Sequence, residues 1–429
     1  MIAGQPSAKD GRAFGAWSTV LGFSNTADGD SAVVSGGYNN QAINRNSTVA
    51  GGVANVAGAV GKADSYGWET IGGGSHNLAS GIWSSVGGGG GNESSDHYAT
   101  VAGGFNNTAS GMNSSVLGGQ ANQATGNQST VAGGYACQAA GTYSTVVGGN
   151  NNAALEGNDF IGSGNSNTTS GGHSGIIAGK ENVVSGPFAI IAGGQFNKAR
   201  GQFSIICGGG GWNESDSNEA RGHYSIVAGG RGNRAVSHYT FAAGRQAVAT
   251  HDGAYVWADA NAFDFNSTTQ NEFAARSTGG ARFVTAIDGS GAATAGVTLA
   301  AGGGSWSSLC DVNSKENFEE VDLKDLLRRL SEIEISTWNY RAQDEDIRHI
   351  GPMAHDFYEA FGVGEDERRI TSIDADGIAL AAIQALNSEL TAKTQQLADQ
   401  GKEIDELKAQ LAEMQQLLKK LISADETSR

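Results

Sequence analysis

Glycine recurs at intervals of fifteen residues through the first half of this chain. Seven successive intervals of that length separate Gly104, Gly119, Gly134, Gly149, Gly164, Gly179, Gly194 and Gly209. Between these glycines stand a short β-prone run such as Ser144–Val147, a polar stretch and a second turn. Helical repeats have periods above roughly thirty residues. Two short strands and two turns in fifteen residues therefore predict one coil of a parallel β-solenoid.

The predicted strands carry apolar side chains in both directions. Val146 is followed by Val147, and Ile190 by Ile191. A strand with only one buried face would alternate apolar with polar residues. We therefore expect one face to fill the coil and the other to meet a neighbouring chain, which predicts an oligomer.

The composition excludes several classes of protein. The chain has 66 glycines but only 3 prolines, which excludes collagen. A formal charge of -17 argues against nucleic acid or an anionic membrane as partner. Cys137, Cys207 and Cys310 are odd in number and far apart, so they form neither a disulfide framework nor a metal clip. No metal or other cofactor is predicted.

Targeting signals are not visible in the sequence. Met1–Gly15 has no apolar core of the secretory type. No run approaches the roughly 18 apolar residues that a membrane helix needs. We expect synthesis in the cytoplasm and no membrane insertion.

Three steps between glycines exceed fifteen residues, and two of them carry related glycine-rich segments, 88–96 and 208–216. Loops that grow out of a solenoid are natural binding positions. The ligand-binding candidates there, for a cation or a sugar, are Glu93, Asp96, Trp212, Glu214 and Asp216. The alternative is a pair of solvated acidic loops. A glycosidase would also need a defined separation of two carboxylates, which a sequence does not show.

The repeat is predicted to end near residue 245, and four parts are expected. Residues 1–245 form the β-solenoid head, and 246–309 form a β-rich neck with strand-like runs at 254–258, 271–276 and 281–286. Residues 310–385 and 386–429 are the last two parts, in which Leu, Glu, Lys and Arg recur at helical spacing.

The last part carries a heptad repeat. Its apolar residues at intervals of seven are Leu390, Leu397, Ile404, Leu411 and Leu418. Companion positions hold Leu386, Leu407, Met414 and Leu421. This pattern predicts a parallel coiled coil. A single helix that packs into an apolar groove would show the same stripe.

The head resembles the heads of trimeric autotransporter adhesins between about residues 16 and 245. The resemblance rests on repeated Ser-Thr-Val-Ala-Gly-Gly and Asn-x-Ala-x-Gly runs. It implies three left-handed parallel β-solenoids about a common axis, and so a trimeric coiled coil. The soluble helix at the end of the chain disfavours an ordinary autotransporter.

The segment from about 310 to 421 resembles the C-terminal intramolecular chaperone of endosialidases and related tail fibres. The resemblance rests on the runs 310–318, 338–340, 348–357 and 374–384. It implies an α-helical domain that trimerises, guides folding of the β-structured fibre, and then releases itself. The cut in that family precedes a serine in a Ser-Asp-x-x-x-Lys motif.

Mapped onto this chain, the motif places the cut between Leu309 and Cys310. Cys310 stands in place of the serine, Asp311 matches the aspartate and Lys315 matches the lysine. A thiol can serve as the nucleophile when a base lies in reach, and it ionises more easily than a hydroxyl. His349 matches the family's His-Ile-Gly run and is the fourth catalytic candidate. The alternatives are a packed histidine at that position and an uncut domain that only trimerises.

The sequence therefore predicts a mainly β, homotrimeric tail-fibre-like protein for attachment to a cell surface, through a glycan or protein receptor. Its expected location is a virion, a phage-tail-like particle or the outside of a cell, and its enzyme activity is a single self-cleavage. The alternatives are a bacterial surface adhesin with an uncleaved trimerisation domain, and a polysaccharide-degrading enzyme.

Overall fold

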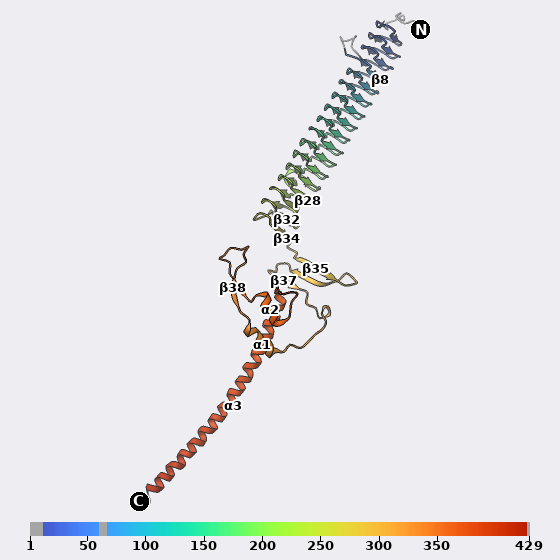
Figure 1. The fold of residues 1–429 in the computed structure, drawn as a ribbon. Coiled ribbons are helices and arrows are strands. Elements are labelled where there is room, and N and C mark those ends of the chain that lie inside the picture. Colours follow the sequence, from blue (N-terminus) through green and yellow to red (C-terminus); the bar gives the residue numbers. More distant parts are fainter. Residues whose placement is uncertain (1–11, 60–66, 427–429) are drawn as a thin grey trace. The chain divides into compact units, whose positions relative to one another are not determined.

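The computed structural model describes residues 12–59 and 67–426, which form two compact units, Met1–Leu309 and Cys310–Arg429. The first unit contains a parallel β-solenoid of about 17 coils, and the second contains the helices (Figure 1). The predicted mainly β solenoid is confirmed. The first eleven residues, which belong to the segment without a predicted secretory signal, lie outside the described residues.

Each coil contributes one strand to each of two parallel sheets. Sheet A consists of β1 (Arg12–Ala13), β3 (Thr26–Ala27), β5 (Gln41–Ala42), β7 (Val56–Ala57), β9 (Leu78–Ala79), β11 (Glu93–Ser94), β13 (Thr108–Ala109), β15 (Gln123–Ala124), β17 (Gln138–Ala139), β19 (Ala153–Ala154), β21 (Thr168–Thr169), β23 (Val183–Val184), β25 (Lys198–Ala199), β27 (Glu219–Ala220), β29 (Arg234–Ala235), β31 (Ala247–Ala249) and β33 (Phe265–Asn266).

Sheet B consists of β2 (Thr19–Val20), β4 (Val33–Val34), β6 (Thr48–Val49), β8 (Thr70–Ile71), β10 (Ser85–Val86), β12 (Thr100–Val101), β14 (Ser115–Val116), β16 (Thr130–Val131), β18 (Thr145–Val146), β20 (Phe160–Ile161), β22 (Gly175–Ile176), β24 (Ile190–Ile191), β26 (Ile205–Ile206), β28 (Ile226–Arg231), β30 (Phe241–Arg245), β32 (Tyr255–Ala258) and β34 (Phe273–Arg276). Thr100 pairs with Ser115, and Ser115 with Thr130, so the register advances by one repeat per coil.

The solenoid extends past the boundary expected near residue 245. β30 pairs in parallel with β32, and β32 with β34, so coils continue to Arg276. These coils lack the fifteen-residue period, because Phe241 pairs with Tyr255 and Tyr255 pairs with Phe273. The antiparallel sheet that follows is β35 (Ala281–Ile287), β36 (Ala293–Leu299) and β37 (Trp306–Ser308).

Only two of the three long steps are insertions. Val56 pairs with Leu78 across a segment that includes residues 60–66, which lie outside the described residues. Lys198 pairs with Glu219 across the second insertion, which holds the short helix η1 (Glu214–Asp216). The segment 88–96, expected to be a loop, instead forms an ordinary coil in which Glu93 lies in β11 between Leu78 and Thr108.

The core of the solenoid is thin. The second residue of each sheet B strand is mostly Val or Ile, and the second residue of each sheet A strand is mostly Ala, and both sets are buried. The space between the two sheets is narrow, so the small alanine side chains of sheet A face the larger Val and Ile side chains of sheet B. The first residue of each two-residue strand points outward, since side chains alternate along a strand.

A column of asparagines forms a second, polar core. In a typical coil, Asn107 donates from Nδ2 to the carbonyls of Gly103 (3.0 Å) and Gly119 (2.9 Å), and the Oδ1 of Asn92 accepts from the Asn107 backbone N–H (3.0 Å). Each buried amide thus satisfies backbone groups of two coils, which would otherwise be costly to bury. The column consists of Asn25, Asn40, Asn55, Asn77, Asn92, Asn107, Asn122, Asn152, Asn167, Asn182, Asn197, Asn218 and Asn233.

Cys137 interrupts this column, and Cys137→Asn is expected to stabilise the solenoid. The Cys137 side chain has no oxygen to accept from the backbone N–H of Asn152, and its Sγ makes only long contacts of 3.7 and 3.6 Å with two carbonyls. One added net hydrogen bond contributes about 1 kcal/mol per chain. Guanidinium unfolding of the parent and variant measures the difference. Cys137→Ala leaves the column broken and should show no gain.

A buried carboxylate lies beside the first insertion. The Glu69 side chain is buried, its Oε1 accepts from Asn44 Nδ2 at 2.8 Å, and neither Glu69 Oε2 nor Asn44 Oδ1 has a partner among the described residues. Burial raises the pKa of Glu69. The folded state therefore favours the neutral acid, and ionisation above the usual glutamate range costs stability.

Glu69→Gln is expected to raise the free energy of unfolding at pH 7 by about 1 kcal/mol. The amide keeps the bond from Asn44 Nδ2 and can donate to Asn44 Oδ1. The gain should shrink as the pH falls below about 4, where the parent carboxyl is also neutral in the unfolded chain. Denaturant unfolding at pH 4 and pH 7 checks this, and an equal gain at both pH values would contradict the account.

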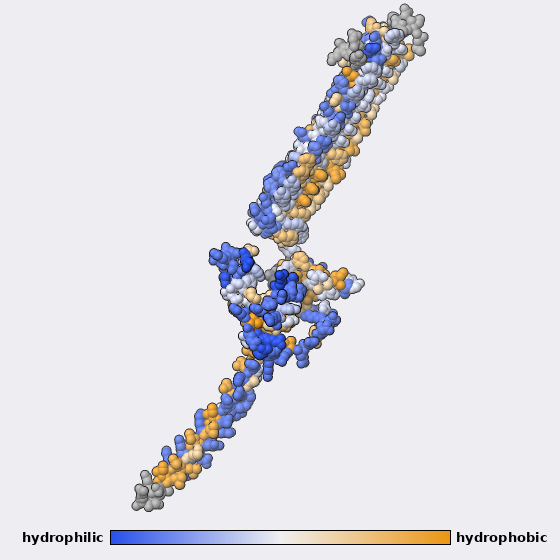
Figure 2. Space-filling view, viewed as in Figure 1, coloured by the Kyte–Doolittle hydropathy of each residue, from blue (hydrophilic) through white to orange (hydrophobic). Residues whose placement is uncertain are grey.

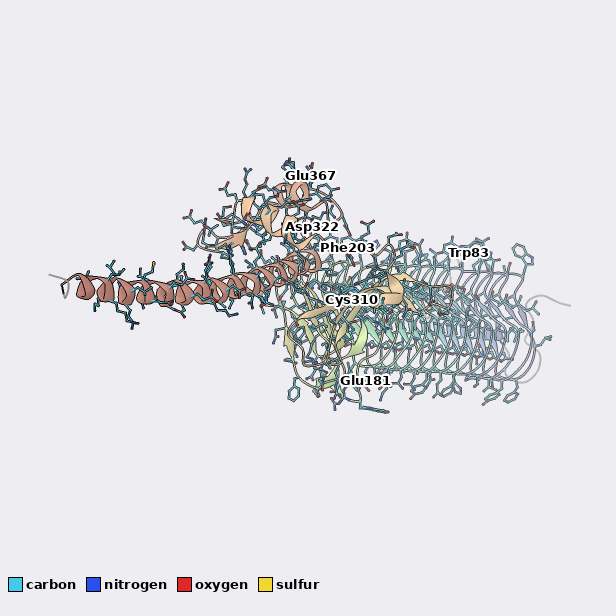
Figure 3. All side chains as sticks on the ribbon, turned by 90° about the horizontal axis from the view of Figure 1, so that it is seen from below. Trp83, Glu181, Phe203, Cys310, Asp322 and Glu367 are labelled. Atoms are coloured by element: carbon cyan, nitrogen blue, oxygen red, sulfur yellow. The ribbon has the colours of Figure 1, made fainter. Side chains whose placement is uncertain are left out.

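The corners of the coils do not all use glycine. Trp83, Glu181 and Phe203, labelled in Figure 3, have φ angles of 63°, 55° and 57°, in the left-handed region that favours glycine. Such residues are strained by about 1–3 kcal/mol each. Stacking between successive coils offsets part of this strain: Trp83 stacks on Trp68 at 4.2 Å, and Phe203 on Phe188 at 4.9 Å.

Up to residue 426, the second unit has three α-helices and a hairpin. They are α1 (Leu323–Glu332), β38 (Ser336–Trp338), β39 (His349–Gly351), α2 (Ala354–Phe361) and α3 (Ser372–Glu426). The Asp322 side chain caps α1 by accepting from the backbone of Lys324 and Asp325, and Gly362 ends α2 in the left-handed conformation. In the described residues of this unit, the buried apolar side chains are Leu326, Phe357, Ala382 and Ala385.

Candidate functional site

A single tight turn builds the site at the start of the second unit. The Asp311 carboxylate accepts from the backbone N–H of Asn313 (2.7 Å) and from its Nδ2 (2.8 Å), which caps the short helix η2 (Val312–Ser314). The backbone N–H of Lys315 then donates to the Val312 carbonyl at 3.2 Å. This Asp-initiated turn is a local effect of sequence, and it folds Lys315 back toward the beginning of the segment.

The turn brings a thiol and an amine together. The Nζ of Lys315 lies 2.8 Å from the Sγ of Cys310, and both side chains are exposed. Cys310, labelled in Figure 3, directly follows Leu309 and therefore supplies the nitrogen of the predicted scissile bond. A nucleophile within hydrogen-bond reach of a base is the arrangement that covalent catalysis requires.

Asp311 and His349 make their contacts away from the pair formed by Cys310 and Lys315. Asp311 directs its carboxylate to Asn313, so its contact is with the turn itself. His349 lies in β39, where its Nε2 is 2.9 Å from Gln343 Oε1 and its ring packs 4.8 Å from Trp338. In the described part of the chain, His349 makes no hydrogen bond with residues 310–315.

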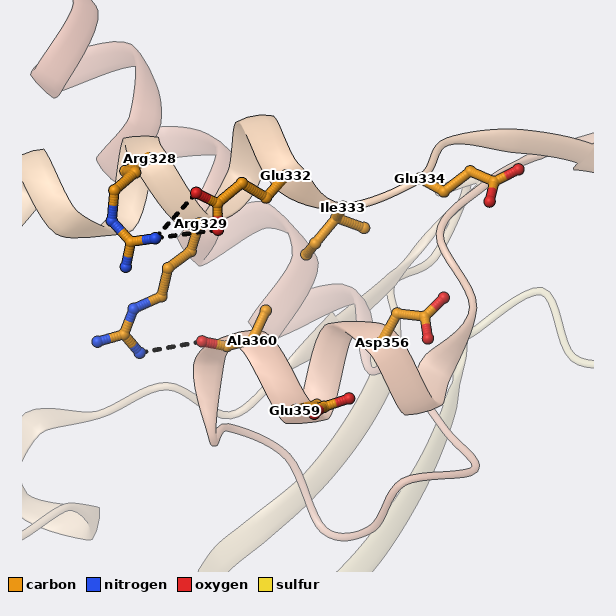
Figure 4. Close-up of a pocket in the computed structure, with 8 residues that line it drawn as sticks. All are labelled: Arg328, Arg329, Glu332, Ile333, Glu334, Asp356, Glu359 and Ala360. Atoms are coloured by element: carbon orange, nitrogen blue, oxygen red, sulfur yellow. Dashed lines mark hydrogen bonds and ion pairs between the residues drawn. The ribbon is translucent and has the colours of Figure 1, made fainter.

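A polar groove separates α1 from α2 (Figure 4). Arg328 binds Glu332 with two contacts of 2.9 Å, and Arg329 donates to the Ala360 carbonyl at 3.0 Å. Glu334, Asp356 and Glu359 complete the rim. The Arg328–Glu332 contacts lie within α1, and the bond from Arg329 to Ala360 joins α1 to α2, so we assign the groove a structural role.

The predicted seam residues all lie on α3 with exposed side chains. The exposed fractions are between 50% and 67% for Leu390, Leu397, Ile404, Leu411 and Leu418. Figure 2 shows apolar residues along this helix. A regular stripe of exposed leucine on a helix of 55 residues is available for a partner helix.

The structure separates the five ligand candidates into two places. Asp96 accepts from the backbone of His97 at 2.6 Å, and the hydrogen bond from the His97 side chain lowers the pKa of Asp96. In the second insertion, Glu214 binds Lys198 and Asp216 binds Arg231. The Lys198 ammonium lowers the pKa of Glu214. Trp212 is 86% exposed.

No cluster of His, Cys, Asp and Glu in the described residues has the arrangement of a metal site. Among the helices described, none combines the length and apolar character that a membrane crossing requires.

Residues 310–363 match the family described as the chaperone of endosialidase. The match begins at Cys310, the first residue of the turn described above. No curated protein matches the chain. Together, the chaperone match and the β-solenoid fit a tail-fibre-like protein with a C-terminal chaperone domain. The resemblance of the repeats to adhesin heads stays a prediction.

The thiol and the lysine could be predicted from the sequence motif, whereas the residues that position the candidates come from the structure. Asn313 donates twice to Asp311. Gln343, the partner of His349, lies in the connection between β38 and β39. An Asp followed two residues later by Asn is a recognisable turn signal, whereas no local signal links Gln343 to His349.

Proposed function

We propose that this chain forms a homotrimeric fibre for attachment to a cell surface, assembled by its C-terminal unit, which then cuts the Leu309–Cys310 bond. The observation that carries the proposal is the 2.8 Å approach of Lys315 Nζ to Cys310 Sγ, at the first residues of the segment that matches the chaperone family.

The cut proceeds through a thioester. Lys315 Nζ takes the thiol proton, and the sulfur attacks the carbonyl carbon of Leu309. The carbon–nitrogen bond then breaks, and the lysine returns the proton to the nitrogen of Cys310. Water finally hydrolyses the thioester, which leaves a carboxylate on Leu309 and restores the thiol. The overall reaction is hydrolysis of one peptide bond, so no co-reactant other than water is required.

Asp311 acts in this scheme as a positioning residue, and Asp311→Ala is expected to slow the cut. Loss of the cap costs about 1 kcal/mol of turn stability, which corresponds to a rate roughly fivefold lower. Asp311→Asn retains an acceptor oxygen and should cut at nearly the parental rate. A time course of product formation after refolding measures both rates. Equal slowing in the two variants would assign Asp311 a role that requires its charge.

Exposed apolar surface supports self-association of the second unit. Phe318 is 70% exposed and Ile350 is 74% exposed, while only four apolar side chains of the described residues are buried there. Large exposed apolar patches mark interaction sites in proteins. The heptad stripe on α3 adds a seam at which copies of the chain pack.

The outer face of sheet B supports association of the solenoids. Its outward side chains include Leu117, Val147, Phe160, Ile177 and Ile190, all of which are exposed. Figure 2 shows the solenoid surface divided lengthwise into a hydrophilic and a hydrophobic strip. We infer that three sheet B faces pack about a common axis, as the resemblance to adhesin heads implies.

A C-terminal assembly domain solves a register problem in such a fibre. Neighbouring coils have nearly the same sequence, so three solenoids displaced by one coil would keep similar contacts. Association of the C-terminal units first raises the local concentration of the strands and fixes their register. Removal of that unit afterwards leaves a fibre that is held by its unfolding barrier.

Mass measurements on the purified full-length chain test the proposal. We expect light scattering to give three chains per particle, and mass spectrometry to give fragments that end at Leu309 and begin at Cys310. A trimer of intact chains would refute the cut, and a monomer would refute the assembly.

Native Cys207, exposed on the outer face of sheet B directly after β26, tests the interface. In a Cys310→Ala background, which removes the other exposed thiol, mild oxidation should link Cys207 between chains. In the double variant Cys207→Ser/Ser185→Cys, the thiol lies on sheet A and should not link.

A surface adhesin with an uncleaved domain is the second candidate. The adhesin-like repeats favour it, and so does a cysteine at a position where relatives carry serine, since a site shaped for oxygen need not align a sulfur. An intact trimer in the experiment above would select this candidate.

A further inference from the structure

Two arginines on neighbouring coils share a single carboxylate. Arg200 and Arg221 follow β25 and β27, and the pairing of Ala199 with Ala220 places them side by side. The nearly buried Glu219 forms ion pairs with both: its Oε1 lies 2.6 Å from Arg200 Nη1 and its Oε2 lies 2.8 Å from Arg221 Nη2. Adjacent strands lie about 4.8 Å apart, so the two like charges repel each other. One carboxylate compensates one of these two charges.

Six basic residues lie on the coils that contain this pair and on the coils that follow. They are here called the basic patch: Lys198, Arg200, Arg221, Arg231, Arg234 and Arg245. The acidic partners in contact with them are Glu214, Asp216, Glu219 and Asp264. The six positive charges exceed the four negative ones, in a chain whose net charge is -17. The excess charge is therefore local and favours an anionic ligand.

The second insertion is joined to the basic patch by ion pairs and carries an exposed aromatic ring. Its helix η1 is fastened by ion pairs of Glu214 with Lys198 and of Asp216 with Arg231 (2.6 Å). These contacts occupy both carboxylates, which argues against the cation site considered from sequence. The same loop carries Trp212 with 86% of its surface exposed. Trp212 offers a flat apolar face on a loop that is ion-paired to the basic patch, and the guanidinium groups of the patch offer bidentate donors.

Arg200 and Arg221 lie on a face of the solenoid that stays exposed to solvent in the proposed fibre. Lys198, Arg200, Arg221 and Arg234 point outward from sheet A, whereas the apolar outer residues proposed to pack between chains belong to sheet B. Because the two sheets form opposite faces of each coil, covering sheet B leaves sheet A in solvent. This step rests on the proposed function.

We propose that Arg200, Arg221 and Trp212 form a binding site for an anionic polysaccharide. The guanidinium groups bind the acidic groups of the glycan, which fit their fork geometry. Trp212 stacks on a neighbouring sugar ring. Glu219 holds the two arginines in place before the ligand arrives, which reduces the side-chain entropy lost on binding.

Binding of the full-length protein to three immobilised glycans tests the site. The probes are alginate, which carries carboxylates, a teichoic acid, which carries phosphates, and neutral dextran. We expect binding to at least one anionic probe, weakened by added salt, and none to dextran. The anionic probe that binds distinguishes carboxylate from phosphate as the recognised group. Equal binding to dextran or to duplex DNA, or no binding to either anionic glycan, overturns the proposal.

Variants locate the site. Arg200→Gln with Arg221→Gln should lower the affinity at least tenfold, and Trp212→Ala several-fold. Replacing both arginines with lysine keeps the charge but removes the planar guanidinium groups with their paired donors, so an intermediate affinity is expected. Arg45→Gln removes an exposed basic side chain near the start of the solenoid, many coils from the site, and should bind like the parent. Parental affinity in the double Gln variant overturns the site.

Light scattering on each variant keeps this test separate from the assembly. A trimer that does not bind glycan refutes the binding site alone. A monomer that still binds refutes the proposed trimer and leaves the site in place.

Discussion

Cys310→Ala is expected to leave the chain uncut, while the parent yields two fragments. Without the sulfur no thioester forms, and the Leu309–Cys310 bond has the stability of an ordinary peptide bond. Lys315→Met should slow the cut by about 10²–10⁴-fold, the usual contribution of a positioned base. Both side chains are exposed, so neither substitution removes packing. Mass spectrometry at intervals after refolding measures the uncut fraction.

Two controls separate chemistry from folding. Cys310→Ser restores the residue that the family motif carries, and cutting by this variant would show that the rest of the site is intact. Hydroxylamine added to the parent should trap the thioester as a hydroxamic acid on Leu309, and no such adduct forms with Cys310→Ala. Cutting in the Ala variant would contradict the role of Cys310, and unchanged cutting in Lys315→Met would contradict the role of the lysine.

Leu411→Asp combined with Leu418→Asp is expected to abolish assembly. Both leucines are more than half exposed in the single chain and occupy the predicted seam. In a coiled coil each aspartate would be buried without a partner, at a cost of several kcal/mol per site. The variant should elute as a monomer with an incompletely folded solenoid. Light scattering and circular dichroism measure the mass and the β content.

The matched control places the same charges on the outer face of the helix. Ala409→Asp with Gln416→Asp adds two carboxylates to α3 at positions away from the seam, and this variant should trimerise like the parent. Loss of assembly in both double variants would indicate a general effect of charge on the helix. A trimer formed by the seam variant would contradict the coiled coil.

The predictions from sequence succeeded where one local rule operates repeatedly. The fifteen-residue glycine period predicted the coils, because a parallel ladder requires equal spacing from one coil to the next. It failed where spacing varied, and the coils that contain β32 and β34 were assigned to the neck. Glu93 was placed in a loop because a run of five glycines, 87–91, obscured which one forms the turn.

The candidate cleavage site could be predicted because its two groups are close in sequence. Cys310 and Lys315 are five residues apart, and an Asp-initiated turn is sufficient to bring Nζ within 2.8 Å of Sγ. His349 is distant in sequence, so its neighbours depend on how the hairpin folds. The structure gives it Gln343 and Trp338 as neighbours.

The sequence alone determined the period, the change of composition after Trp306 and the heptad stripe, because each is a pattern among residues that are close together along the chain. The tertiary structure decided which side chains meet across coils. The Asn column, the stacked rings of Trp68 and Trp83, and the Glu219 carboxylate between Arg200 and Arg221 all join residues about one coil apart. Their contacts depend on the register and on the length of each insertion, which are fixed only when the coils stack.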